Sequence, residues 1–301
     1  MTSRRYAGLF WILVPLAVII AFIVILFHSA NKNGGETPAL IRVGVLPDQG
    51  EELLKSQHEP LLNYLSREVG LEFKLVIPSS YDELVRRAAL GEIDLAYFGG
   101  LTFIQAEAKK AVAALVMRDI DFNFVSYFFT RAWDSGHEIR EFSGRKLGFG
   151  SSQSTSGHLM PRKFLKTMNI EPESFFSEVV YSGSHDRTVR QVVEGAVDLG
   201  VANAWVVERM IETGRIGPKS IRIIWKTPPY ADYVWAIRTG ISEELRMRIL
   251  DAFLKLSRAD PRHRIVLERQ GAASFFPTGE NEFAQLRQIS RELGMLESET
   301  D

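Results

Sequence analysis

The chain has 301 residues, and its 36 Lys and Arg residues nearly balance its 37 Asp and Glu residues, for a formal net charge of −1. This balance argues against a dedicated nucleic-acid-binding protein, which usually carries a basic excess on one face. The absence of Cys excludes disulfides, thiolate metal sites, a Cys nucleophile and a lipid-modified N-terminal Cys.

The first predicted element is an apolar segment from Leu9 to Phe27, and no charged residue lies between Arg5 and Lys32. A helix of this length would extend about 30 Å, enough to cross the hydrocarbon core of a bilayer. Because Arg4 and Arg5 precede the segment, the positive-inside bias predicts a cytoplasmic N-terminus and an exported body.

Two alternatives for this segment are a buried core helix and a cleaved signal peptide. A core helix rarely stays apolar on every face over five turns. A signal peptide has an apolar region of about 7–15 residues and an A-x-A-like cleavage site, which His28, Ser29 and Ala30 match poorly. We therefore predict that residues 1–30 form a cytoplasmic stub and an uncleaved transmembrane anchor, with a signal peptide as the alternative. Residues 31–40, which include the polar sequence NKNGGETP, are predicted to be a linker.

After the linker, strands and helices alternate. A β-branched apolar run predicts a strand over Ile41–Pro47, and leucines at helical spacing predict a helix over Glu51–Val69. The alternation continues with strands over Glu72–Ile77 and Asp94–Phe98 and helices over Tyr81–Leu90 and Thr102–Lys109. This order predicts βαβ units around a mostly parallel sheet.

The same alternation restarts after a polar, turn-rich stretch at residues 132–144. Strands are predicted over Lys146–Phe149, Val179–Tyr181, Leu199–Ala202 and Ile221–Trp225, and helices over Gly157–Met168, Arg187–Glu194 and Trp205–Thr213. Three more helices close the chain, over Ser242–Leu256, Pro261–Gln270 and Glu280–Leu293. Two α/β units followed by helices predict two lobes, with a ligand in the crevice at the carboxyl ends of the strands.

The most informative stretch runs from Gly148 to Pro161, with the sequence GFGSSQSTSGHLMP between a predicted strand and a predicted helix. The first amides of a helix have no partner within it, and the helix dipole adds partial positive charge there. The hydroxyls of Ser154, Thr155 and Ser156 would add donors, which together form a cradle for a tetrahedral oxyanion. The alternative is that Thr155 or Ser156 is only an N-cap.

A second polar cluster, Gly183 to Asp186, also lies between a strand and a helix. His185 could hydrogen-bond an anion there, or the cluster could be only a capping turn. Catalytic motifs are absent: the sequence contains no G-x-S-x-G, no Walker A, no H-E-x-x-H and no G-x-G-x-x-G that opens a helix after a strand. The six His residues show no metal-ligand spacing. We therefore expect no catalytic residue, no metal and no cofactor.

Three blocks occur together, Ser80–Ala106, Ser154–Pro161 and Ser182–Asn203. In this order they resemble the phosphonate-binding proteins of ABC importers, within the phosphate, phosphite and phosphonate group of periplasmic substrate-binding proteins. The resemblance covers about residues 40–295. It implies an α/β, two-lobed type II periplasmic-binding-protein-like fold with two crossover strands, which here would follow one N-terminal transmembrane helix. Because the second unit is inserted into the first, we expect lobe 1 at residues 41–135 and 233–295 and lobe 2 at 140–230.

The resemblance also implies ligand contacts by position. These fall on Tyr81, Ser154, Thr155, Ser156, His185 and Asp232. Two positions depart from the family's pattern. Trp205 stands where aminoalkylphosphonate binders carry a carboxylate for the ligand amine, and Phe124 stands where an aromatic hydroxyl is expected. Both changes make the pocket less polar and predict a small or apolar-substituted oxyanion, with Trp205 lining the ligand site.

The function that these residues favour is a non-enzymatic, extracytoplasmic solute-binding protein. It would capture a phosphonate-, phosphite- or phosphate-like oxyanion and deliver it to an ABC-type membrane permease. Asp232 suits a protonated oxyanion, because it can accept a hydrogen bond from P–OH. We expect the protein on the periplasmic side of the bacterial inner membrane, anchored by its N-terminal helix, or soluble in the periplasm if that segment is cleaved. The alternative is a membrane-tethered sensor or accessory protein that uses the same pocket without transport; an esterase that uses Ser154 or His185 is less favoured.

Overall fold

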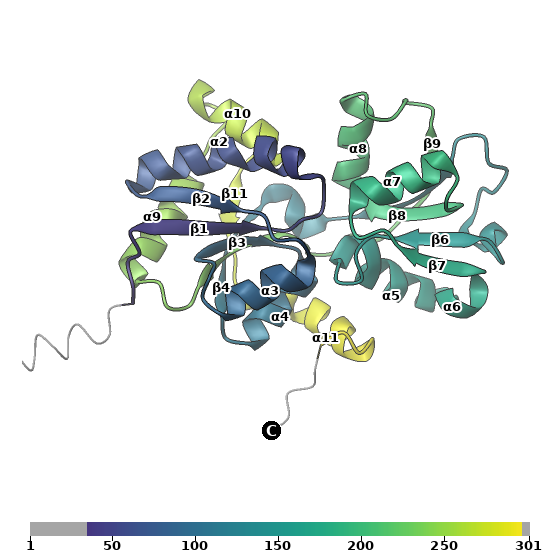
Figure 1. The fold of residues 1–301 in the computed structure, drawn as a ribbon, viewed down its shortest axis with the longest axis horizontal. Helices are drawn as coiled ribbons and strands as arrows, with labels where there is room; N and C mark the ends of the chain where they lie inside the picture. The colour runs from purple at the N-terminus through teal and green to yellow at the C-terminus, as the bar shows by residue number, and fades with distance from the viewer. Residues whose placement is uncertain (1–34, 297–301) are drawn as a thin grey trace, which may run out of the picture.

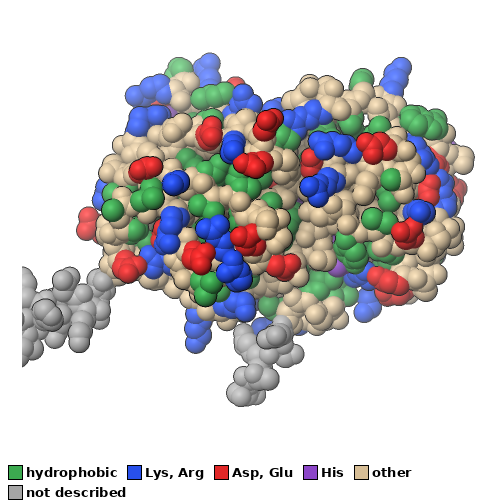
Figure 2. Space-filling view, viewed as in Figure 1, with side chains coloured by type: hydrophobic (Ala, Val, Ile, Leu, Met, Phe, Trp, Pro, Cys, Tyr) green, Lys and Arg blue, Asp and Glu red, His purple; other side chains and the backbone are tan. Residues whose placement is uncertain are grey.

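A computed structural model describes residues 35–296, which form two α/β lobes that lie side by side (Figure 1). The predicted cytoplasmic stub and membrane anchor lie outside the described residues. Within residues 35–296, no helix combines the length and the apolar character needed to cross a membrane. Charged side chains of both signs are interspersed over the visible face of both lobes (Figure 2), as the near-neutral net charge suggests.

The first lobe is built on a six-stranded sheet with the order β11-β4-β10-β3-β1-β2. Its strands are β1 Leu40–Val45, β2 Glu72–Val76, β3 Leu95–Phe98, β4 Val112–Arg118, β10 Val234–Arg238 and β11 Phe275–Pro277. Its helices are α2 Glu51–Val69, α3 Tyr81–Ala89, α4 Gly100–Ala108, α9 Glu243–Leu254, α10 Pro261–Gln270 and α11 Ala284–Glu292. Strands β1, β2 and β3 are parallel, whereas β10 runs antiparallel to both β3 and β4. Helices cover both faces, with α2 and α10 opposite α3 and α4 (Figure 1).

The second lobe is built on a five-stranded sheet with the order β7-β6-β8-β5-β9. Its strands are β5 Ser126–Arg131, β6 Lys146–Phe149, β7 Glu178–Tyr181, β8 Leu199–Asn203 and β9 Ile221–Lys226. Its helices are α5 Met160–Thr167, α6 Pro172–Phe175, α7 His185–Glu194 and α8 Ala204–Glu212. Strand β6 is parallel to β7 and β8, and β5 is antiparallel to β8 and β9.

The chain passes between the lobes twice, once between β4 and β5 and once between β9 and β10. The two crossover segments lie against each other. Phe124 and Tyr230 exchange backbone hydrogen bonds of 2.8 and 3.0 Å, and the Asp232 N–H donates to the Asp121 carbonyl at 3.1 Å. The expected first lobe reached residue 135, but β5 pairs with β8 and β9 and so belongs to the second sheet. The first crossover therefore occurs earlier in the chain than predicted.

The lobes meet through buried side chains as well as through the crossovers. Leu159 ends the turn after β6 and Met160 begins α5, both in the second lobe, yet both are buried in the hydrophobic core of the first lobe. Phe164 of α5 packs against the same core. The segment that carries the predicted cradle is therefore pressed against the first lobe.

Candidate functional site

The predicted cradle forms the turn between β6 and α5. Residues Thr155–Leu159 are a single π-helical turn that leads into α5, and the N-cap Ser154 accepts the Gly157 N–H at 2.9 Å. Single π-helical turns are rare and often occur at functional sites. Ser154, Thr155 and Ser156 are almost completely buried, at 2%, 2% and 1% exposure. The start of this helix, with its unpaired amides and its dipole, therefore faces the interior between the lobes.

A second helix N-terminus, from the first lobe, faces the cradle. Helix α4 follows Gly99, which provides no side-chain cap. The Gly100 N–H donates to Asp232 Oδ1 at 2.9 Å, and the Leu101 N–H donates to Thr155 Oγ1 at 2.9 Å across the lobe boundary. Two helix N-termini thus converge, and each favours negative charge.

This second N-terminus was not predicted from the sequence. It predicted a helix from Thr102, but α4 begins at Gly100. The signal was present, because Gly99 and Gly100 directly follow an apolar strand, just as Gly148 and Gly150 mark the end of β6. A Cβ at Gly100 would lie 2.4 Å from Leu286 Cδ2, so a larger residue there would force the Leu286 side chain of α11 to move.

Three buried side-chain oxygens around these helix starts have no hydrogen-bond partner among the described residues. They are the Tyr81 hydroxyl, Ser156 Oγ and Asp232 Oδ2, and each residue is at most 2% exposed. Leaving one such group unpaired costs about 1–3 kcal/mol. Two hydroxyl donors and a carboxyl oxygen match the needs of an oxyanion, whose oxygens accept hydrogen bonds and whose acidic hydroxyl donates one.

Burial raises the pKa of Asp232 to about 7. The Gly100 N–H and the nearby Ser156 and Thr155 hydroxyls favour the carboxylate and partly offset this rise. Close to neutral pH the site can therefore hold or release one proton. Burial also raises the pKa of Tyr81 well above its ordinary value, so that its hydroxyl remains a donor.

A second buried polar group lies behind the cradle and also joins the lobes. The Tyr233 hydroxyl donates to Asp48 Oδ2 at 2.8 Å and accepts from Asn203 Nδ2 at 3.0 Å. His185, the first residue of α7, donates its backbone N–H to the Asp48 carbonyl at 3.0 Å, and its Nε2 lies 3.4 Å from the Tyr233 hydroxyl. Burial raises the pKa of Asp48 to about 6 and lowers that of His185 to about 4, so the imidazole is neutral at neutral pH.

The structure separates Trp205 from the rest of the predicted site. Trp205 lies on α8 and is only partly buried; it packs against Gly271 of the first lobe and against Arg118, whose Cζ is 5.8 Å from the ring centre. Phe124 lies in the first crossover, and its ring meets the Tyr233 ring edge-on at 5.4 Å. Tyr81, Asp232 and the three cradle residues thus lie together, with His185 behind them and Trp205 at the outer edge.

Two lobes joined by adjacent crossover segments, with two helix N-termini facing each other at the boundary, define a periplasmic substrate-binding protein of the two-sheet α/β kind. Residues 43–283 match the family model of the phosphonate periplasmic substrate-binding protein of ABC transporters. This match covers most of the chain, and the chain belongs to that family.

Individual relatives support the same assignment. A probable ABC transporter phosphite binding protein, PhnD1, from Prochlorococcus marinus (strain MIT 9301) is 29% identical over 288 residues, which are 90% of this chain and 96% of the relative. The phosphate-import protein PhnD of Mycolicibacterium smegmatis (strain ATCC 700084 / mc(2)155) is 26% identical over 221 residues, 69% of each chain. The structure of P. marinus PhnD1 in complex with methylphosphonate matches with a TM-score of 0.82 and 27% identity, over 86% of this chain and 100% of that one. The predicted family and the two-lobed α/β fold are confirmed, and the relatives are transport proteins rather than enzymes.

Proposed function

We propose that this protein captures a small phosphorus oxyanion, of the phosphite, phosphate or methylphosphonate kind, between its lobes and delivers it to an ABC-type membrane permease. The observation that carries this proposal is the set of three buried, unpartnered oxygens, on Tyr81, Ser156 and Asp232, at two facing helix N-termini. The phosphite-binding relative and the methylphosphonate complex of PhnD1 support the ligand class.

The cradle would hold the anion through hydroxyls and backbone amides. Ser154 and Thr155 already accept hydrogen bonds from Gly157 and Leu101, so each can still donate its own hydroxyl proton. Thr155 would donate either to the ligand or to the nearby Asp232 carboxylate. Asp232 would share one proton with the ligand, either by accepting from P–OH or by donating as the neutral acid. A fully ionised anion beside an ionised Asp232 would be repelled.

Binding would close the lobes by a hinge motion of the two crossover segments. We place the first lobe at residues 41–118 and 234–295 and the second lobe at 126–226, with the hinge between them, on the basis of strand pairing. Thr155 and Leu101, which bond across the boundary, would separate when the lobes open.

We also propose that the apolar segment from Leu9 to Phe27 anchors the exported body in the membrane. The anchored protein should remain in the membrane fraction after a high-salt wash. A protein that is released and begins near residue 31 would show instead that the segment is a cleaved signal peptide.

Titration calorimetry with phosphite, phosphate and methylphosphonate tests the ligand class, with 2-aminoethylphosphonate as the comparison. We expect saturable binding of at least one of the first three and weaker binding of the aminoethyl compound, because the only carboxylate among Tyr81, Asp232 and the three cradle residues is Asp232, which shares its proton with the oxyanion. No binding of any of these anions, or turnover of phosphate or phosphonate esters, would contradict the proposal. A gene deletion that abolishes uptake would support transport, whereas retained uptake would favour the tethered sensor.

A further inference from the structure

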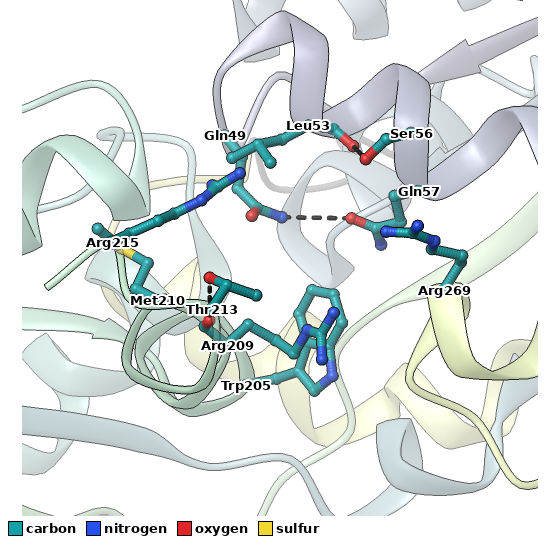
Figure 3. A pocket seen from close by; sticks show the side chains of 10 residues that line it. All are labelled: Gln49, Leu53, Ser56, Gln57, Trp205, Arg209, Met210, Thr213, Arg215 and Arg269. Atoms are coloured by element: carbon teal, nitrogen blue, oxygen red, sulfur yellow. Dashed lines mark hydrogen bonds between the residues drawn. The ribbon is translucent and has the colours of Figure 1, made fainter. Parts of the chain in front are cut away.

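A second polar pocket lies at the lobe boundary, and none of the cradle residues lines it (Figure 3). One wall comes from the first lobe and the other from α8 and its C-terminal end in the second lobe. The lining residues are Gln49, Leu53, Ser56, Gln57 and Arg269 on the first wall and Trp205, Arg209, Met210, Thr213 and Arg215 on the second. The cavity measures about 100 Å³.

The pocket is positively charged. Three arginines line it, and no Asp or Glu does. Arg209 is held by Glu212 at 3.1 Å, and its Cζ lies 6.0 Å from the centre of the Trp205 ring. The guanidinium groups of Arg215 and Arg269 have no hydrogen-bond or ion-pair partner among residues 35–296. Both side chains are exposed to solvent, and they line the same cavity from opposite walls.

A neutral donor accompanies the arginines. Gln57 is only 8% exposed, and its Oε1 accepts a long hydrogen bond of 3.4 Å from Gln49 Nε2. The Gln57 Nε2 group donates to none of the described residues. In Figure 3 the Gln57 amide lies beside Arg269, and the Arg215 side chain extends toward Gln49. The cavity therefore offers guanidinium and amide donors from both walls.

Because the walls belong to different lobes, closure brings Arg269 toward Arg209 and Arg215. Like charges in one cavity repel, and an anion between them offsets that repulsion. We propose that this arginine pocket is a second anion site, which binds a small free oxyanion such as sulfate or inorganic phosphate and favours the closed arrangement of the lobes. This proposal rests on the proposed closure of the lobes around the cradle ligand. Because both anions would favour the closed arrangement, binding at one site should strengthen binding at the other by the same factor. A cavity of this size suits a small anion rather than a nucleotide.

The test uses sulfate as the probe and protein whose cradle is saturated with methylphosphonate, so that sulfate cannot compete there. Calorimetry at constant ionic strength should show one saturable sulfate site. Arg215→Gln and Arg269→Gln should each weaken it about fivefold or more. The matched control is Arg187→Gln, which removes an exposed arginine at a different opening of the lobe boundary and should leave sulfate binding unchanged.

The coupling has its own readout. Methylphosphonate should dissociate about two- to tenfold more slowly in sodium sulfate than in sodium chloride of equal ionic strength, and the difference should vanish in Arg269→Gln. The absence of saturable sulfate binding, or equal sulfate binding by Arg187→Gln and Arg269→Gln, would overturn the second site. If methylphosphonate itself fails to bind, the proposed function fails before sulfate is added, and a sulfate titration of the protein alone then decides whether the arginine pocket is a site.

Discussion

Replacing Asp232 by Asn changes how the cradle handles the proton that it shares with its ligand. Burial raises the pKa of Asp232 from 3.8 to about 7, which corresponds to a preference of about 4 kcal/mol for the neutral acid relative to the same group in water. Above pH 7 the empty site loses this proton, and a dianionic ligand can bind well only if one proton returns. The Kd of the parent protein should therefore rise by up to about tenfold per pH unit above pH 7.

The amide that Asp232→Asn introduces does not titrate. The Gly100 N–H, which donates to Asp232 Oδ1 in the parent, should keep the amide oxygen in the same place and point the amide nitrogen at the ligand. The variant then donates to a dianion without a proton but loses the acceptor for P–OH. We expect the Asp232→Asn variant to bind methylphosphonate about 10-fold or more weakly than the parent does at pH 6. At pH 9 we expect the variant to bind it more tightly than the parent does.

Calorimetry of methylphosphonate binding at pH 8.5, in two buffers with different ionisation heats, counts the protons directly. The parent should take up about one proton for each ligand bound, and the Asp232→Asn variant should take up close to none. If the parent takes up no proton and its affinity changes with pH as that of the variant does, the role assigned to Asp232 is wrong.

Two further substitutions test the contacts between the lobes. Thr155→Ala removes the acceptor of the Leu101 N–H and a donor to the ligand, so calorimetry should show methylphosphonate affinity lower by about 10- to 150-fold; parent-like affinity would mean that the hydroxyl only caps the helix. Gly271→Ala places a Cβ 2.2 Å from Trp205 Nε1, which should hinder closure and lower affinity about tenfold or more. The control is Gly70→Ala, since Gly70 has a similar left-handed backbone but a Cβ there would meet no atom nearer than 3.9 Å. Thermal unfolding should show that both variants lose about 1–2 kcal/mol of stability. Only Gly271→Ala should also lose affinity for methylphosphonate.

The sequence predicted β1, β2, β3 and β6 to β9 but missed β4, β5, β10 and β11, three of which border a crossover. Strands β4 and β5 are buried on both faces along most of their length, so they lack the alternation of apolar and polar residues that identifies a half-buried strand. The apolar run of β4 also follows α4 closely and cannot be told from a helix by periodicity alone. Because β5 was missed, the expected end of the first lobe fell at residue 135 instead of before Ser126.

The candidate site also contains one part that could be predicted from the sequence and one part that could not. The cradle at Ser154, Thr155 and Ser156 could be predicted because its chemistry depends on neighbours in the sequence, namely a strand end, hydroxyls and a helix start. The buried group of Asp48 and Tyr233 could not, because its members are far apart in the chain and are brought together only by the packing of the lobes.

A crystal structure of the protein with methylphosphonate bound tests the location of the ligand site most directly. We predict the anion between the start of α4 and the π-helical turn, with its oxygens about 3 Å from the Tyr81 hydroxyl, Ser156 Oγ and Asp232 Oδ2. An anion bound elsewhere, with these three oxygens still unpaired, would contradict the central claim that the closed lobe boundary is the ligand site.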